Sequence, residues 1–175
     1  MTEAAYRPED LVRAVRAAGI SDERLLQAVR TTPRAAFVPA GHQAHAYHDV
    51  PISIGHGQVT TQPSLSAVMI EGLDLSVDEH VLEIGAGLGF QTALLARLAT
   101  DVVSIERWPD IAHQAQLNLA RQGIRNVPTV GDTWTGQGPV GHTTARCHRV
   151  LVETEGPFPG GGGWEPPPPS YLPQA

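Results

Sequence analysis

The feature that most constrains the fold is a glycine-rich segment that directly follows an apolar run. Residues 81–89 read VLEIGAGLG, so Gly85, Gly87 and Gly89 stand at alternate positions. Glycine lets the backbone turn sharply and approach a ligand closely, and the N-terminus of a following helix offers unpaired N–H groups to an anion. The segment therefore predicts a strand, a tight ligand-binding loop and a helix. The alternative is a tight turn in some other α/β domain.

Helical and strand-like patterns alternate on both sides of this segment. The expected helices cover residues 65–75, 90–99 and 109–122, and the expected strands cover residues 80–84, 101–105, 126–130 and 149–153. Alternation of helices with short apolar strands is typical of a parallel sheet with right-handed crossovers. We therefore predict a doubly wound α/β domain.

The region before the alternation has two helical patterns and then an irregular stretch. Apolar residues recur at helical spacing until Gly19, Ser21 is expected to cap a second helix, and Pro33 is expected to end it. Residues 37–39 are expected to form a buried anchor. Residues 49–63 are rich in Gly, His and Thr and show no regular pattern. Irregular segments of that length are often functional loops.

Composition divides the chain into three parts. Residues 1–63 form an N-terminal helical region with its loop, residues 64–153 form the α/β core, and residues 154–175 form a tail rich in Gly and Pro. Few residues of the tail can offset the entropy lost on ordering, so we predict that the tail is disordered.

Three acidic residues stand at the ends of successive expected strands. Glu83 lies in the first strand, Glu106 follows the second, and Asp132 follows the third. The carboxyl ends of parallel strands face the ligand crevice, where an acidic side chain can accept both ribose hydroxyls of an adenosine cofactor. We predict this role for Glu106. Glu83 suits the ammonium group of S-adenosylmethionine, and Asp132 suits the adenine amino group, although Asp132 taken alone also fits an acidic turn residue.

Several separate segments together resemble the protein-L-isoaspartate O-methyltransferase family. They are residues 33–39 (PRAAFVP), 46–49 (AYHD), 54–63 (IGHGQVTTQP), 78–98, 104–107 (SIER) and 131–133 (GDT). The similarity extends over residues 7–136 and is more specific than a single glycine loop. It implies a Rossmann-like fold of the class I S-adenosylmethionine-dependent methyltransferases.

The resemblance also implies roles for individual residues. The implied cofactor-binding residues are Gln58, Val59, Glu83, Gly85, Ala86, Gly87, Gly89, Glu106, Arg107, Asp132 and Thr133. Thr60 and Thr61 are implied to lie at the transferred methyl group and the substrate carboxylate, and members of the family usually have a serine where Thr61 stands. Because an ionised carboxylate is already a nucleophile, catalysis would depend on positioning and on excluding water.

The family pattern fades after residue 136. The sheet is therefore expected to be incomplete on its C-terminal side, and the chain is expected to be a truncated or divergent member. The implied function is methylation of isoaspartyl carboxylates in damaged proteins, which starts their repair. Two alternatives stay open: a specialised enzyme that methylates an aspartate in a peptide, and a non-catalytic remnant that binds the cofactor.

Composition argues against several other partners and sites. The formal net charge is -6 and no stretch is rich in Arg, which disfavours binding to nucleic acid or to an anionic membrane. We expect a cytoplasmic monomer, with self-association through an exposed edge at residues 149–153 as the alternative. His42, His45 and His48 are not accompanied by a nearby set of Cys or acidic ligands, so no metal site is expected.

Overall fold

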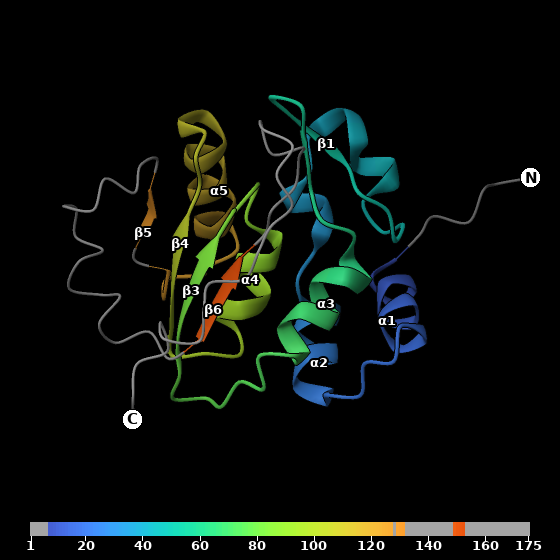
Figure 1. Cartoon of the computed structure of the whole chain (residues 1–175). Coiled ribbons are helices and arrows are strands. Elements are labelled where there is room, and N and C mark those ends of the chain that lie inside the picture. Colours follow the sequence, from blue (N-terminus) through green and yellow to red (C-terminus); the bar gives the residue numbers. More distant parts are fainter. Residues whose placement is uncertain (1–6, 128, 132–148, 153–175) are drawn as a thin grey trace, which may run out of the picture.

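A computed structural model describes residues 7–127, 129–131 and 149–152. Asp132, Thr133 and the expected tail of residues 154–175 lie outside the described residues. Figure 1 shows a central sheet with helices beside it and a group of N-terminal helices to one side. None of the helices in the described ranges is long and apolar enough to cross a membrane.

The central sheet contains parallel strands, as the alternating pattern predicts. The strands are β3 (His80–Ile84), β4 (Asp101–Ile105), β5 (Thr129–Gly131) and β6 (Arg149–Val152). Their order is β5-β4-β3-β6, and each neighbouring pair is parallel. The chain therefore moves from β3 towards β5 and then returns to the other side of β3. A ligand crevice is expected at such a reversal, beyond the carboxyl end of β3.

Strand positions agree with the sequence analysis best in the middle of the sheet. β3 and β4 cover the expected residues, whereas β5 begins at Thr129 and not at Asn126. The Asn126 side chain donates hydrogen bonds to Ala96 O at 2.8 Å and to Thr100 O at 3.2 Å. Asn126 thus fastens the connection between α4 and β4 before regular pairing with β4 begins.

The three helices of the core differ from expectation only at their ends. They are α3 (Pro63–Glu71), α4 (Phe90–Ala96) and α5 (Pro109–Arg121). α3 begins two residues earlier than expected because proline is well tolerated in the first helical turn. α4 ends three residues earlier because Arg97 N and Leu98 N bond to carbonyls three residues back, which tightens the chain into a turn.

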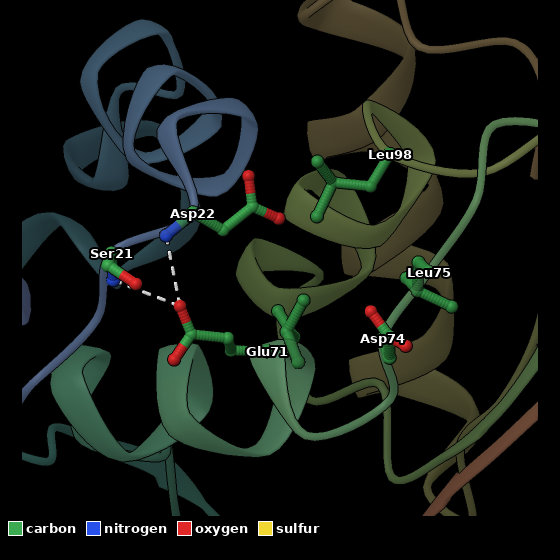
Figure 2. A pocket seen from close by; sticks show the side chains of 7 residues that line it. Ser21, Asp22, Glu71, Asp74, Leu75 and Leu98 are labelled. Carbon is green, nitrogen blue, oxygen red and sulfur yellow. Dashed lines mark hydrogen bonds between the residues drawn. The ribbon is translucent and has the colours of Figure 1, made fainter.

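The N-terminal helices are α1 (Pro8–Ala17) and α2 (Glu23–Thr31), and the expected cap of α2 is wrong by one residue. The side chain of Asp22, not of Ser21, accepts the hydrogen bonds of the first helical N–H groups. Ser21 N and Asp22 N instead donate to Glu71 Oε1 at 2.9 and 3.0 Å, as Figure 2 shows. The start of α2 is therefore bound to the end of α3.

The segment expected to be irregular contains a short hairpin. After two 3-10 helices, η1 (Arg34–Phe37) and η2 (Ala40–His45), the chain forms β1 (Ser53–Gly55) and β2 (Gln58–Val59), which pair antiparallel. The two residues of the turn, His56 and Gly57, have φ of +50° and +69°. Positive φ at both central residues gives the tight hairpin turn whose twist matches the strands.

One hydrophobic core joins the N-terminal helices to the sheet and its helices. Phe37 is fully buried, as the expected anchor requires, and its ring packs edge to face against Phe90 at 6.0 Å. The same cluster contains buried residues from both sides of residue 63, among them Leu11, Val15, Leu25, Leu26, Ala67, Ile70, Val81, Leu94 and Leu95. The helices that precede the α/β core therefore share its interior.

Candidate cofactor and substrate site

The glycine-rich loop is held against the end of β4 by backbone hydrogen bonds. Gly85 N and Ala86 N both donate to Ile105 O, at 2.8 and 3.2 Å. Gly85, Gly87 and Gly89 have φ of +99°, +52° and +93°, a region that side-chain-bearing residues rarely adopt. The alternate glycines are thus required by the backbone path. The loop lies at the carboxyl edge of the sheet, where a ligand is expected.

Substitution of Gly89 tests this requirement. Gly89 precedes α4, and a Cβ atom there would lie 3.4 Å from Leu119 Cγ and 3.5 Å from Ala115 Cβ. Because strain and crowding add, Gly89→Ala is expected to lower the free energy of unfolding by about 1–3 kcal/mol in urea titrations. Gly41→Ala is the control, since nothing lies within 4 Å of its added Cβ and its φ is ordinary. Equal stability of the two variants would contradict the prediction.

The carboxylate of Glu106 lies against the glycine loop. Its Oε2 accepts a hydrogen bond from Gly87 N at 2.9 Å, and its Oε1 accepts one from Trp108 N at 3.0 Å. The residue is 7% exposed. Each carboxylate oxygen keeps further acceptor capacity, so Glu106 can accept two more hydrogen bonds, for example from a pair of neighbouring hydroxyls.

Glu83, expected to contact a cationic ligand, lies inside the core. Its carboxylate is fully buried and accepts hydrogen bonds from the hydroxyls of Ser104 and Thr92 and from Gln91 Nε2. Burial raises the pKa of Glu83, and the three hydrogen bonds oppose that rise. Ser104 belongs to β4, whereas Thr92 and Gln91 belong to α4. Glu83 therefore joins β3 to both elements and supports the loop from within the core.

The β1–β2 hairpin lies against the loop and against the start of α5. Ile54 Cδ1 lies 3.6 Å from the place of a Cβ on Gly87. At the hairpin turn, the rings of His56 and Trp108 stack with centroids 4.0 Å apart, and His56 Nε2 lies 2.9 Å from Asp110 Oδ2. The hydrogen bond from His56 lowers the pKa of the Asp110 carboxyl. Two segments distant in the sequence thus lie against each other.

Replacing His56 with alanine is expected to loosen this hairpin without unfolding the protein. A ring stack contributes about 1 kcal/mol, which corresponds to about a fivefold change in local opening. Hydrogen exchange at residues 53–59, measured by mass spectrometry, is expected to accelerate by that factor. His56→Phe keeps an aromatic ring and has the same backbone requirement, so it is expected to change less. Unaltered exchange in His56→Ala would show that the stack does not hold the hairpin.

The residues expected near the methyl group follow one another between β2 and α3. Gln58 and Val59 form β2, and the side chain of Val59 is exposed. Thr60 N donates to Ile52 O at 2.7 Å, which extends the hairpin pairing, and Thr61 is buried. Arg107, the other expected neighbour of the cofactor, places its guanidinium 4.8 Å from the centre of the Trp108 ring.

A buried arginine, to which the sequence alone assigned no role, holds this segment. Arg34 Nη2 donates to Thr60 Oγ1 at 3.0 Å. Its other hydrogen bonds end on the backbone carbonyls of Ala46, His48 and Val50. The signal available in the sequence was its place in the family-like segment 33–39.

A cavity of about 380 Å³ lies apart from these residues. Figure 2 shows it among the ends of α2, α3 and α4, lined by Ser21, Asp22, Ile70, Glu71, Asp74, Leu75 and Leu98. It contains none of the expected site residues. Asp22 and Glu71 use their carboxylates as acceptors for backbone N–H groups of this junction, so we interpret the cavity as a structural feature.

His42 and His45 lie in η2, and His48 follows that helix. The rings of His45 and His48 contact each other edge to face, with centroids 5.4 Å apart. Over residues 7–127, 129–131 and 149–152, no group of three or more His, Cys, Asp or Glu side chains is arranged to hold a metal ion.

Comparison with protein families gives a match over most of the chain. The model of the protein-L-isoaspartate(D-aspartate) O-methyltransferase family matches residues 6–145. The chain belongs to this family. The resemblance inferred from the separate sequence segments is thereby confirmed.

Individual members of the protein-L-isoaspartate O-methyltransferase family are similar over most of this chain. The enzyme of that name from Methanoculleus marisnigri is 49% identical over 148 residues, which cover 85% of this chain and 66% of the relative. Protein-L-isoaspartate O-methyltransferase 1 from Rhodopseudomonas palustris is 45% identical over 155 residues, which cover 88% of this chain and 62% of the relative. The chain therefore spans slightly less than two thirds of the length of these relatives.

Solved structures of family members have the same fold. One protein-L-isoaspartate O-methyltransferase superposes with a TM-score of 0.67 at 27% identity, over 83% of this chain and 47% of that protein. A family member from Plasmodium falciparum, in complex with S-adenosyl-L-homocysteine, gives a TM-score of 0.63 at 20% identity, over 75% of this chain and 65% of that protein. The Rossmann-like class I methyltransferase fold expected from the sequence is confirmed.

Proposed function

We propose that this chain is a protein-L-isoaspartate O-methyltransferase, which transfers a methyl group from S-adenosylmethionine to isoaspartyl carboxylates. One observation carries the proposal: the β1–β2 hairpin, which leads directly into Thr60 and Thr61, lies against Gly87 through Ile54 and stacks on Trp108 through His56. The segment suited to a substrate carboxylate therefore lies beside the segment suited to an adenosine cofactor. Family membership and the names of the relatives support the same reaction.

The chemistry of the loop fits S-adenosylmethionine. Glu106 is fixed by two backbone N–H groups and keeps acceptor capacity on both oxygens, which suits the two ribose hydroxyls. The backbone at Gly85 and Gly87 can approach the ligand because neither residue carries a side chain. The residues proposed to bind the cofactor are Gln58, Val59, Gly85, Ala86, Gly87, Gly89, Glu106 and Arg107, together with Asp132 and Thr133 outside the described residues. Glu83 is proposed to position the loop from beneath.

The reaction demands positioning more than acid–base chemistry. Bound S-adenosylmethionine supplies an electrophilic methyl group on a sulfonium sulfur. The substrate carboxylate is already ionised, so no side chain of this protein has to remove a proton. Thr60 and Thr61 are proposed to fix the carboxylate by hydrogen bonds, and the buried position of Thr61 helps to exclude water.

The wider organisation follows from the same proposal. We divide the chain into the region that carries the hairpin, residues 1–63, the cofactor-binding core, residues 64–153, and the tail, residues 154–175. The substrates are isoaspartyl-containing proteins or peptides, the protein acts as a monomer, and its location is the cytoplasm. Because β6 stands at one end of the described strand order, sedimentation at increasing concentration tests whether this edge mediates self-association.

The test is transfer of labelled methyl groups to a pair of peptides that differ only in one linkage. The expected result is label on the peptide with isoaspartate and none on the peptide with normal aspartate. Label on the aspartyl peptide would favour a specialised aspartate methyltransferase. Label on neither peptide, from folded protein that binds S-adenosylhomocysteine, would overturn the proposed activity and leave a cofactor-binding protein.

A further inference from the structure

Arg34 places a buried positive charge at the proposed substrate segment, and none of the carboxylates in the described part of the chain forms a hydrogen bond or ion pair with it. It is 0% exposed, and its hydrogen bonds have four acceptors, three backbone carbonyls and one hydroxyl, namely Ala46 O, His48 O, Val50 O and Thr60 Oγ1. Burial lowers the pKa of Arg34 to about 10, so the guanidinium stays protonated at neutral pH. A neutral donor would hold the same carbonyls at a smaller desolvation cost.

Asp49 is the acidic residue whose charge acts on Arg34, but its carboxylate accepts hydrogen bonds from other groups. The charge of Asp49 raises the pKa of Arg34. The Asp49 oxygens, however, accept hydrogen bonds from Gln62 Nε2 and from Ser64 N, each at 2.8 Å. Arg34 therefore holds the segment at Thr60, and Asp49 holds it on the other side of Thr61. The segment between them is fixed from both ends.

The Thr60 hydroxyl still has its proton available for a hydrogen bond. Its oxygen accepts hydrogen bonds from Arg34 Nη2 at 3.0 Å and from Ile52 N at 3.1 Å. A hydroxyl has two acceptor lone pairs and one proton. With both lone pairs occupied, the proton remains to be donated, and none of the hydrogen bonds found among the described residues uses it. Thr60 is therefore prepared as a donor to an incoming acceptor.

We propose that Arg34 and Thr60 together select a carboxylate over its neutral ester. This inference rests on the proposed function and concerns the same site. Thr60 donates its proton to the substrate carboxylate, and Arg34 is the positioning residue that fixes the hydroxyl and supplies the positive charge behind it. An anionic acceptor gains from both effects, whereas the methyl ester product gains little from the charge. The same pair thus favours binding of substrate and release of product.

The experiment compares the affinities of two peptides in the presence of S-adenosylhomocysteine. One peptide contains isoaspartate, and the other contains the uncharged isoasparagine at the same position. Wild-type protein is expected to prefer the carboxylate peptide by at least about tenfold, as one charge-assisted hydrogen bond allows. Thr60→Val is expected to lose about tenfold in affinity for the carboxylate peptide and little for the amide peptide. Thr60→Ser, which keeps the hydroxyl, is the matched control and is expected to retain the preference.

Variants of Arg34 separate charge from structural support. Arg34→Gln is expected to reduce the ratio of the two affinities about tenfold, while Arg34→Lys, which keeps the charge, is expected to retain most of it. Circular dichroism and cofactor affinity report whether each variant is folded. If Arg34→Gln does not fold, the comparison of Thr60→Val with Thr60→Ser still tests the proposal. Equal loss for both peptides, or an unchanged ratio in Thr60→Val, would overturn the inference. Wild-type protein that binds no isoaspartyl peptide would instead overturn the proposed function, and this inference with it.

Discussion

Glu106→Gln is expected to weaken the binding of S-adenosylhomocysteine by at least about 30-fold, which corresponds to about 2 kcal/mol. The substitution keeps the size of the side chain but replaces one oxygen with an NH₂ group. That group then faces Gly87 N or Trp108 N, both of which are donors in the native protein. The loop has to shift, and one of the two acceptors proposed for the ribose hydroxyls is lost. Isothermal titration calorimetry measures the effect directly.

The matched control for this variant is Glu9→Gln. Glu9 is exposed in the first turn of α1, so the same loss of charge there is expected to leave the affinity within about twofold of the wild type. If Glu106→Gln also binds S-adenosylhomocysteine with unchanged affinity, the proposed contact between Glu106 and the ribose is wrong.

Glu83→Ala is expected to lower the free energy of unfolding by about 3–5 kcal/mol. Removing the carboxylate leaves the hydroxyls of Ser104 and Thr92 and the amide of Gln91 without their buried acceptor, and it opens a cavity between β3, β4 and α4. Urea unfolding followed by circular dichroism measures the loss. A loss below about 1 kcal/mol would show that water or neighbouring groups replace the carboxylate.

Glu83→Gln separates the charge of this residue from its hydrogen bonds. The pKa of Glu83 is raised in the folded protein, so its contribution to stability is fully present below its unfolded pKa of about 4.3 and is lost as the pH rises through the folded pKa. The difference in unfolding free energy, wild type minus Glu83→Gln, is therefore expected to fall as the pH rises above about 4.3. A difference that rises with pH would reverse the sign of the assigned shift.

Local sequence patterns were sufficient for the centre of the fold. β3 and β4 are short, mainly apolar runs, and their central residues Val81, Val102 and Val103 are buried. The alternate glycines predict the loop because the positive φ values at these positions are rarely adopted by any other residue. Predictions that depended on such local demands agree with the structure.

Features that depend on distant contacts were missed or misplaced. Ser21 and Asp22 are both good caps, and the choice between them depends on Glu71, about 50 residues away in the chain. The sequence does not predict the hairpin because its turn has a histidine, His56, at a positive φ that usually calls for Gly, Asn or Asp. Arg34 was given no role because its acceptors are mainly backbone carbonyls, which have no sequence signature. The hydrogen bonds of Glu83 to hydroxyls on β4 and α4 have no sequence signature either, because these residues become neighbours only in the folded sheet.

The hydrophobic core that extends across residue 63 has a consequence for how this protein unfolds. Arg24 donates hydrogen bonds to Leu75 O and Leu98 O, so polar contacts cross the same division as the core. A fragment that begins at Ser64 would lose the buried residues that α1 and α2 contribute to the core cluster of Leu94 and Leu95, and it would expose an apolar surface that the intact chain covers. The N-terminal helices are therefore not a detachable accessory, and heating is expected to melt them and the sheet in a single cooperative transition.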